Sequence, residues 1–163
     1  MEIEKTEDIG EFKGLCEDYP YITRPMEHAE EKDFYFLIDS EENRVAFGYI
    51  RTILDKVGVI GSVFVKEEER GKGYGSELVV ELEGKLRERG AWLCVLGVHN
   101  ENQRGLDFWE KNGYHVLIGS VNEFLVKNPL DLGILDKISP VSVPKNEVTI
   151  LGKWFVGSDL DEE

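Results

Sequence analysis

The residues with the clearest chemical potential lie between Arg70 and Ser76, where three glycines alternate with larger residues. An apolar run at 62–65 precedes them, and a helical pattern begins at Ser76. Glycines let a backbone approach an anion closely, and the exposed N–H groups of a helix start point at it. Arg70 and Lys72 add positive charge beside the same place. The segment therefore predicts a phosphate-binding turn between a strand and a helix.

Two common nucleotide-binding motifs do not fit this segment. A dinucleotide fingerprint needs Gly-x-Gly-x-x-Gly and an acidic residue about twenty positions later. Here Gly75 comes one residue early, and the stretch 92–96 contains no acid. A P-loop needs Gly-Lys followed by Ser or Thr, and the sequence contains no such tripeptide. Both alternatives are disfavoured.

The pattern Arg-x-x-Gly-x-Gly at 70–75 resembles the acetyl-CoA pyrophosphate loop of the GNAT N-acetyltransferase superfamily. The segment 102–114 is similar to the family's Asn-x-x-Ala-x-x-Phe-Tyr-x-Lys-x-Gly-Phe pattern, in the expected order along the chain. The resemblance covers about residues 1–128 and is strongest from 57 to 115. It implies direct transfer of acetyl from acetyl-CoA to a primary amine within a ternary complex. The runner-up function is a non-catalytic acyl-CoA-binding or sensing protein.

The resemblance also implies which residues hold the co-substrate. The pyrophosphate would lie on the loop and the helix start, at Arg70, Gly71, Lys72, Gly73, Tyr74, Gly75 and Ser76. The backbone of Val63, Phe64 and Val65 would pair with the amides of the pantetheine arm, as one strand pairs with another. Asn102 would cap the following helix and touch the same arm. The mechanism implies no metal and no Ser or Cys nucleophile.

Trp109 stands where many family members have the tyrosine that protonates the departing thiolate. An indole N–H is only a hydrogen-bond donor and cannot act as a general acid. Three alternatives follow: the thiolate leaves unprotonated, water supplies the proton, or another residue replaces the tyrosine. A core aromatic packed beside the cofactor arm is the simpler interpretation of Trp109.

The general base is not marked by a family residue. Some relatives that acetylate amino termini have a glutamate at the position of Gly97. His99, expected just past the end of that strand, has a side chain whose pKa suits accepting a proton from an ammonium group. A single histidine at a strand end is more often structural or exposed. His28 and His115 are weaker candidates.

Around these residues we expect an α/β fold, a mixed, splayed β-sheet flanked by helices on both faces. The sheet should open between the strands ending at Val65 and Val98 to admit the co-substrate. Strands are expected at 2–4, 33–39, 44–53, 57–66, 91–98, 114–118 and 123–126, and helices at 8–16, 24–32, 76–89 and 102–112. The GNAT domain would span 1–128. A C-terminal extension, 129–163, would carry a strand at 147–156 that covers a sheet edge, joins a dimer partner or closes over the substrate site.

Composition limits the partners. The chain has 163 residues and a net charge of −14, which disfavours nucleic acid or an anionic membrane as a partner. It has no apolar run long enough to span a membrane, and its acidic N-terminus is unlike a signal peptide. Its two cysteines, Cys16 and Cys94, have no metal-binding spacing. We expect a cytoplasmic protein, with a homodimer left open.

The acidic charge suggests an acceptor. Residues 1–50 contain 14 acidic and 5 basic side chains, a balance of −9, and in relatives this third of the chain forms the acceptor side of the cleft. The Tyr19-Pro20-Tyr21 segment would supply aromatic walls for an alkylammonium group. It is flanked by five acids: Glu17, Asp18, Glu27, Glu30 and Glu31. We expect a cationic small molecule, a peptide N-terminus or a lysine; the alternative is that these acids only solvate exposed helix faces.

Overall fold

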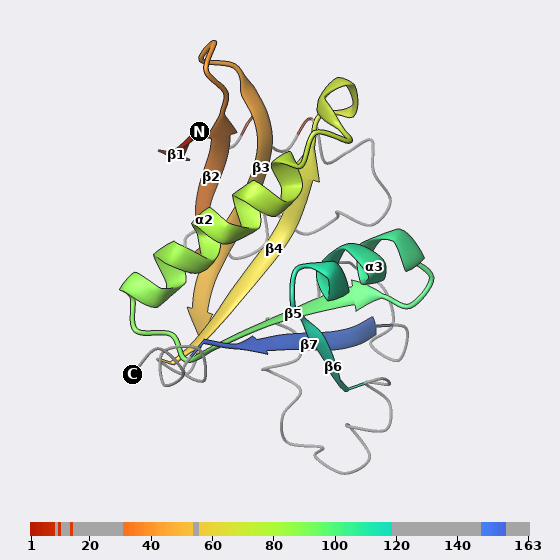
Figure 1. Cartoon of the computed structure of the whole chain (residues 1–163). Coiled ribbons are helices and arrows are strands. Elements are labelled where there is room, and N and C mark those ends of the chain that lie inside the picture. The colour runs from red at the N-terminus through yellow and green to blue at the C-terminus, as the bar shows by residue number, and fades with distance from the viewer. Residues whose placement is uncertain (9, 11–13, 15–30, 54–55, 119–147, 156–163) are drawn as a thin grey trace, which may run out of the picture.

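The structure, a computed structural model, describes residues 1–8, 10, 14, 31–53, 56–118 and 148–155. These residues form one seven-stranded sheet with two α-helices (Figure 1). The helices expected at 8–16 and 24–32 lie mostly outside the described residues. The strand expected at 123–126 and the boundary at 128/129 lie wholly outside them.

The strand order is β1-β2-β3-β4-β5-β7-β6, and each neighbouring pair is antiparallel except β4 and β5. The strands are β1 (Glu2–Thr6), β2 (Asp33–Ile38), β3 (Arg44–Ile53), β4 (Val57–Val65), β5 (Leu93–His99), β6 (His115–Ile118) and β7 (Val148–Trp154). The expected hairpin of β2 and β3 is confirmed. Its turn is fixed by Asp39, whose carboxylate accepts hydrogen bonds from the N–H groups of Glu41 and Asn43 at 2.9 and 2.8 Å.

β4 and β5 are paired only over their first halves. The parallel ladder contains three residue pairs and ends at Val59 and Val95. Beyond that point the two strands separate, as Figure 1 shows, and their facing backbone edges do not pair with each other. The splay expected between the strand ends is therefore confirmed.

A bulge in β4 lies just beyond this last pair. The register across β3 passes from Phe47–Phe64 to Tyr49–Gly61, so β4 carries one extra residue there. Ser62 lies in the bulge with φ of 51°, a left-handed conformation that is uncommon outside glycine. The Tyr49 ring lies so close to Gly61 that a side chain there would overlap it. Because a bulge bends its strand, this one helps to direct β4 away from β5.

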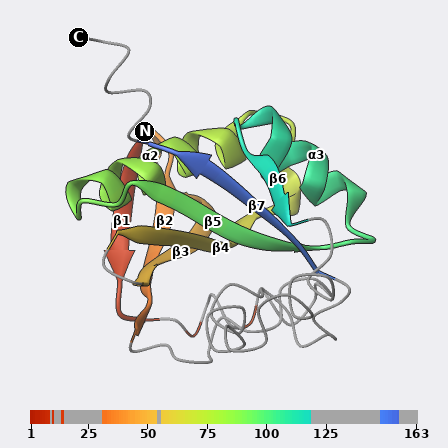
Figure 2. The same ribbon diagram turned by 90° about the horizontal axis from the view of Figure 1, so that it is seen from below.

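The two described α-helices, α2 (Tyr74–Glu88) and α3 (Gln103–Lys111), lie on the same side of the sheet (Figure 1 and Figure 2). The leucine stripe expected on α2 is confirmed, since Leu78, Leu82 and Leu86 are fully buried against the sheet. The helix begins two residues earlier than Ser76, because Gly73 adopts φ of 84° and becomes its N-cap. The first turn of α2 is thus part of the glycine-rich motif itself.

The strand expected in the C-terminal extension is confirmed as β7, and its position limits its role. β7 is hydrogen-bonded to β5 on one side and to β6 on the other, inside the same sheet as the other strands. It has no free edge with which to extend the sheet of a dimer partner. Neither described helix has the length and apolarity that a membrane span requires.

Candidate active site

A cleft of about 890 Å³ lies where β4 and β5 diverge. Residues 60–65 of β4 and 96–98 of β5 line it on two sides. The segment after β4, the start of α2, the turn before α3 and α3 itself contribute the remaining lining residues: Glu69, Arg70, Gly71, Gly73, Tyr74, Gly75, Ser76, Glu101, Asn102, Gln103, Arg104, Gly105, Phe108, Trp109 and Lys111. The structure thus brings together every residue predicted to hold the co-substrate except Lys72.

The loop and helix start offer unused backbone donors. Gly71 and Gly73 have φ of 81° and 84°, and a Cβ added at either would meet no atom within 4 Å. The first bond of α2 runs from the Glu77 N–H to the Gly73 carbonyl at 3.1 Å. The N–H groups of the preceding turn therefore have no partner within the helix. Open space in front of these amides fits an anionic group such as a pyrophosphate.

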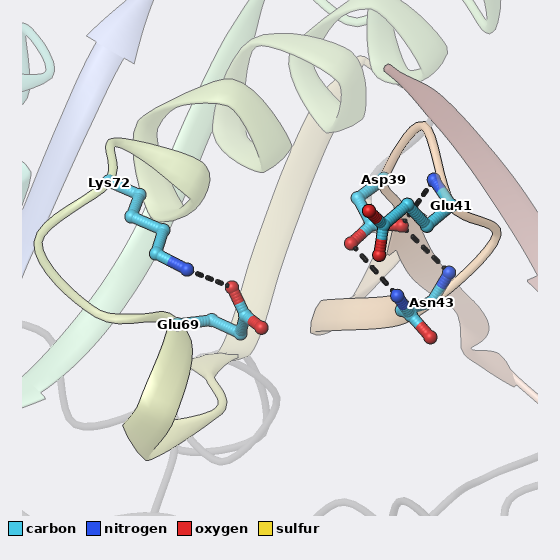
Figure 3. Close-up of polar contacts among 5 residues, drawn as sticks. All are labelled: Asp39, Glu41, Asn43, Glu69 and Lys72. Atoms are coloured by element: carbon cyan, nitrogen blue, oxygen red, sulfur yellow. Dashed lines mark hydrogen bonds and ion pairs between the residues drawn. The ribbon is translucent and has the colours of Figure 1, made fainter.

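Lys72 corrects one expectation from the sequence. Its Nζ lies 2.8 Å from Glu69 Oε2, on the side of the β2–β3 turn (Figure 3). The hydrogen bond that Lys72 donates to Glu69 raises the pKa of Lys72, with a smaller contribution from the charge of Asp39. Lys72 is not among the residues that line the cleft. Its charge is therefore placed beside carboxylates rather than facing the anion seat.

Arg70 lines the cleft, but its side chain also contacts the end of β4. Its Nε donates to the Val65 carbonyl at 3.1 Å, and its guanidinium lies over the Phe64 ring at 5.2 Å. The Phe64 ring in turn packs on Phe47, with ring centres 5.0 Å apart. These contacts tie the loop to the end of β4. They hold the glycine amides at a fixed position relative to the splayed strands.

α3 enters the site at Asn102, whose expected role as N-cap is confirmed by a 3.0 Å hydrogen bond from the Gly105 N–H. His99 lies elsewhere than expected: it is the last residue of β5, not beyond it, and its side chain is buried. Its Nδ1 accepts a hydrogen bond from the Glu101 N–H at 3.1 Å. His99 does not line the cleft, and its role as a general base stays a prediction.

Trp109 is buried with 8% of its surface exposed. Its ring stacks edge-on against Phe108 and Tyr114, with ring centres 5.1 and 5.0 Å apart. This packing agrees with the interpretation of Trp109 as a core aromatic beside the cofactor arm. The tyrosine acid of the family therefore has an apolar counterpart here.

A buried polar cluster lies behind Trp109. Tyr114 donates to Glu83 Oε2 at 2.9 Å, and Lys153 Nζ from β7 lies 3.0 Å from the same carboxylate. Burial raises the pKa of the Tyr114 hydroxyl above its usual range, and burial raises the pKa of the Cys94 thiol to about 12. Glu83 is buried, and both a cation and a hydroxyl group satisfy its carboxyl oxygens. The cluster joins β7 to α2 and to the packing of Trp109.

The residues expected to form the acceptor side are described only in part. Of the acids expected to attract a cation, Glu31 is described; Glu17, Asp18, Glu27 and Glu30, with the Tyr19-Pro20-Tyr21 segment, lie outside the described residues. Glu31 forms an ion pair with Arg51, which is 3% exposed. Its charge is therefore at least partly engaged by the protein itself.

Four of the cleft residues that were not predicted from the sequence matter for its chemistry. Ser62 lines the cleft from the bulge in β4, and Arg104, Phe108 and Lys111 line it from α3. The last three recur at i, i+4 and i+7, a helical spacing that the sequence does contain. No local signal marks Ser62, because the bulge depends on the pairing of β4 with β3.

The sheet is mixed and splayed, and backbone N–H groups suited to an anion border its cleft. These features define the class of protein as an acyltransferase fold that uses a nucleotide thioester. The chain belongs to the acetyltransferase (GNAT) family, whose model matches residues 3–114. The family membership and the mixed, splayed sheet expected from the sequence are thereby confirmed.

Two curated relatives match about half of the chain. It is 26% identical over 88 residues to a spermidine N(1)-acetyltransferase of Thermoplasma acidophilum, covering 54% of each chain. It is 30% identical over 83 residues to the uncharacterized N-acetyltransferase YobR of Bacillus subtilis, covering 51% of this chain and 33% of that one. The chain thus spans about half or less of the length of these relatives.

Solved structures match nearly the whole chain at low identity. A Bacillus subtilis acetyltransferase in complex with CoA aligns over 94% of this chain and 97% of its own, at 16% identity and a TM-score of 0.65. Mutant forms of the spermidine/spermine N-acetyltransferase SpeG from Vibrio cholerae align over 99% of both chains, at 11% identity and a TM-score of 0.67. These likenesses establish the fold.

Proposed function

We propose that the chain is an acetyl-CoA-dependent N-acetyltransferase that moves acetyl directly to a primary amine. The observation that carries the proposal is the cleft between β4 and β5, with the amides at Gly73 and the first turn of α2 at its edge. The pyrophosphate of acetyl-CoA fits this anion seat, and the unpaired strand edges beyond Val59 and Val95 fit its amide-bearing arm.

In the proposed reaction the amine first loses a proton and its nitrogen attacks the thioester carbonyl. Strand amides near Val65 would donate hydrogen bonds to the oxyanion that develops. The C–S bond then breaks and the sulfur leaves as a thiolate, while the nitrogen gives up a second proton to solvent as the new amide forms. A thiol has an ordinary pKa of about 8.5, so its thiolate can leave without a dedicated acid and take its proton from water. Holding both substrates in one cleft would supply most of the rate enhancement.

We further propose a cationic acceptor, such as a polyamine, an aminoglycoside or a lysine-like amine. The support is the balance of −9 in residues 1–50, together with the polyamine named for two of the similar proteins. The pairing of Glu31 with Arg51 argues that the acids outside the described residues, rather than Glu31, would attract the cation.

The test combines binding and turnover. Acetyl-CoA should raise the melting temperature, and thiol release should follow when cationic amines are added. The KM for the acceptor should rise with ionic strength, because salt screens charge attraction. An unchanged melting temperature at saturating acetyl-CoA would exclude the function. Equal use of neutral and cationic amines at every salt concentration would exclude only the cationic acceptor.

A non-catalytic acyl-CoA-binding protein is the second candidate, favoured by two departures from the family. Trp109 is a buried aromatic with no acid function, and Gly97 supplies no base. This candidate expects a melting shift with acetyl-CoA but no thiol release with any amine in the panel.

A further inference from the structure

One face of α3 lines the cleft with two cations separated by an aromatic residue. Arg104, Phe108 and Lys111 are spaced at i, i+4 and i+7, so they form a single stripe along the helix. Arg104 and Lys111 are exposed, and neither forms a hydrogen bond or ion pair with any residue that the structure describes. They therefore offer positive charge to whatever occupies the cleft, whose lining also contains Glu69 and Glu101.

The stripe is held against the anion seat by packing. A Cβ added to Gly75, in the first turn of α2, would lie 3.1 Å from the Phe108 ring. Phe108 thus contacts the helix start directly, and its two neighbours on the stripe lie on either side of this contact. A helix rises about 1.5 Å per residue, so roughly 10 Å of helix separates Arg104 from Lys111.

The cations of the loop are engaged differently. Lys72 is paired with Glu69 (Figure 3) and does not line the cleft. Arg70 donates its Nε to the Val65 carbonyl. Coenzyme A carries a pyrophosphate and, apart from it, a phosphate on the 3′-position of its ribose. The loop and the α2 amides suit the pyrophosphate, which leaves the second anion to be bound by other groups.

We propose that α3 binds the 3′-phosphorylated ribose of acetyl-CoA through Arg104 and Lys111, while the loop binds the pyrophosphate through backbone amides. This inference rests on the proposed function and adds to it a site that discriminates the 3′-phosphate. Guanidinium and ammonium groups are both suited to a phosphate dianion, Arg as a planar fork and Lys as a point charge.

The experiment compares the affinities for acetyl-CoA and for its 3′-dephospho analogue. The unaltered protein should prefer acetyl-CoA by about tenfold or more, since charge-assisted hydrogen bonds to the phosphate are lost in the analogue. The double variant Arg104→Gln/Lys111→Gln should lose this preference and still bind the analogue as the unaltered protein does. A charge-matched control, Lys56→Gln/Lys85→Gln, removes two cations that do not line the cleft and should keep the preference.

Each other outcome decides against the proposal. An unchanged preference in the double variant would overturn it, as would an unaltered protein that binds both compounds equally tightly. If Lys72→Gln alone erased the preference, the loop rather than α3 would hold the phosphate. Failure of the unaltered protein to bind either compound would overturn the proposed function as well, so the two failures are distinguishable.

Discussion

The glycine-rich loop and α3 border the same cleft, but they offer it different chemical groups. The loop and the first turn of α2 present backbone N–H groups, placed by positive φ angles at Gly71 and Gly73. α3 presents side chains, with Arg104 and Lys111 on its cleft-facing stripe. Lys72 contributes to neither set, since it lies in the glycine-rich motif but does not line the cleft.

The largest expected effect comes from the backbone side of this comparison. Gly73→Val should abolish the melting shift with acetyl-CoA, because valine disfavours φ of 84° by about 1–3 kcal/mol and its side chain would project into the open space before the anion seat. Thermal shift against acetyl-CoA concentration measures this.

A matched pair separates conformation from bulk. Gly73 and Gly84 both have open space around an added Cβ, but only Gly73 has a positive φ. Gly73→Ala should weaken binding, whereas Gly84→Ala should leave it intact and stabilise α2 by roughly 1 kcal/mol. Equal affinities in the two alanine variants would break the claim that the loop acts through its backbone.

The next prediction concerns Trp109, an aromatic side chain that lines the cleft. Trp109→Ala should destabilise the fold by about 3–5 kcal/mol, because it leaves a cavity between Phe108 and Tyr114. Trp109→Phe should retain most affinity and turnover, since an indole has no acid–base function to lose. Denaturant unfolding and thiol release measure the two properties. A Phe variant that binds acetyl-CoA normally but does not turn over would reveal a specific role for the indole N–H.

A smaller effect on stability is expected at alkaline pH, and it comes from the buried residue Cys94. Burial raises the pKa of the Cys94 thiol from 9.0 to about 12. Above pH 9 the unfolded chain releases a proton that the folded chain keeps, so the free energy of unfolding should fall from pH 9 toward 12. Cys94→Ala should make this decline shallower. In a Cys16→Ser background, Cys94 should react with thiol reagents only on unfolding; rapid reaction in the native state would contradict this burial.

The smallest effect should come from Lys72→Gln. Because the ammonium group is paired with Glu69 outside the cleft, its loss should change acetyl-CoA affinity by less than about twofold at physiological salt. Isothermal titration of the variant beside the unaltered protein measures this. A tenfold weakening would show that Lys72 takes part in binding acetyl-CoA. It would contradict the claim that the loop binds through backbone amides and α3 through charged side chains.

The local features of this site could be predicted from the sequence. Turn glycines, the leucine stripe of α2 and the Asn102 cap each depend on residues close together in the chain, so their positions were predictable. The start of α2 was misplaced by two residues because Gly73 acts as its N-cap. Ser62, the burial of His99 and the direction of Lys72 depend on distant residues or on tertiary packing, and no spacing rule encodes them. The position of β7 between β5 and β6 is likewise a long-range pairing.

That position of β7 has a consequence during protein synthesis. The chain emerges from the ribosome from its N-terminus, so β5 and β6 are made well before the strand that fits between them. Until residues 148–154 arrive, the outer edge of β5 remains an unpaired strand edge, the kind of surface that promotes aggregation. Nascent chains stalled before β7 should therefore depend on chaperones more than completed ones do.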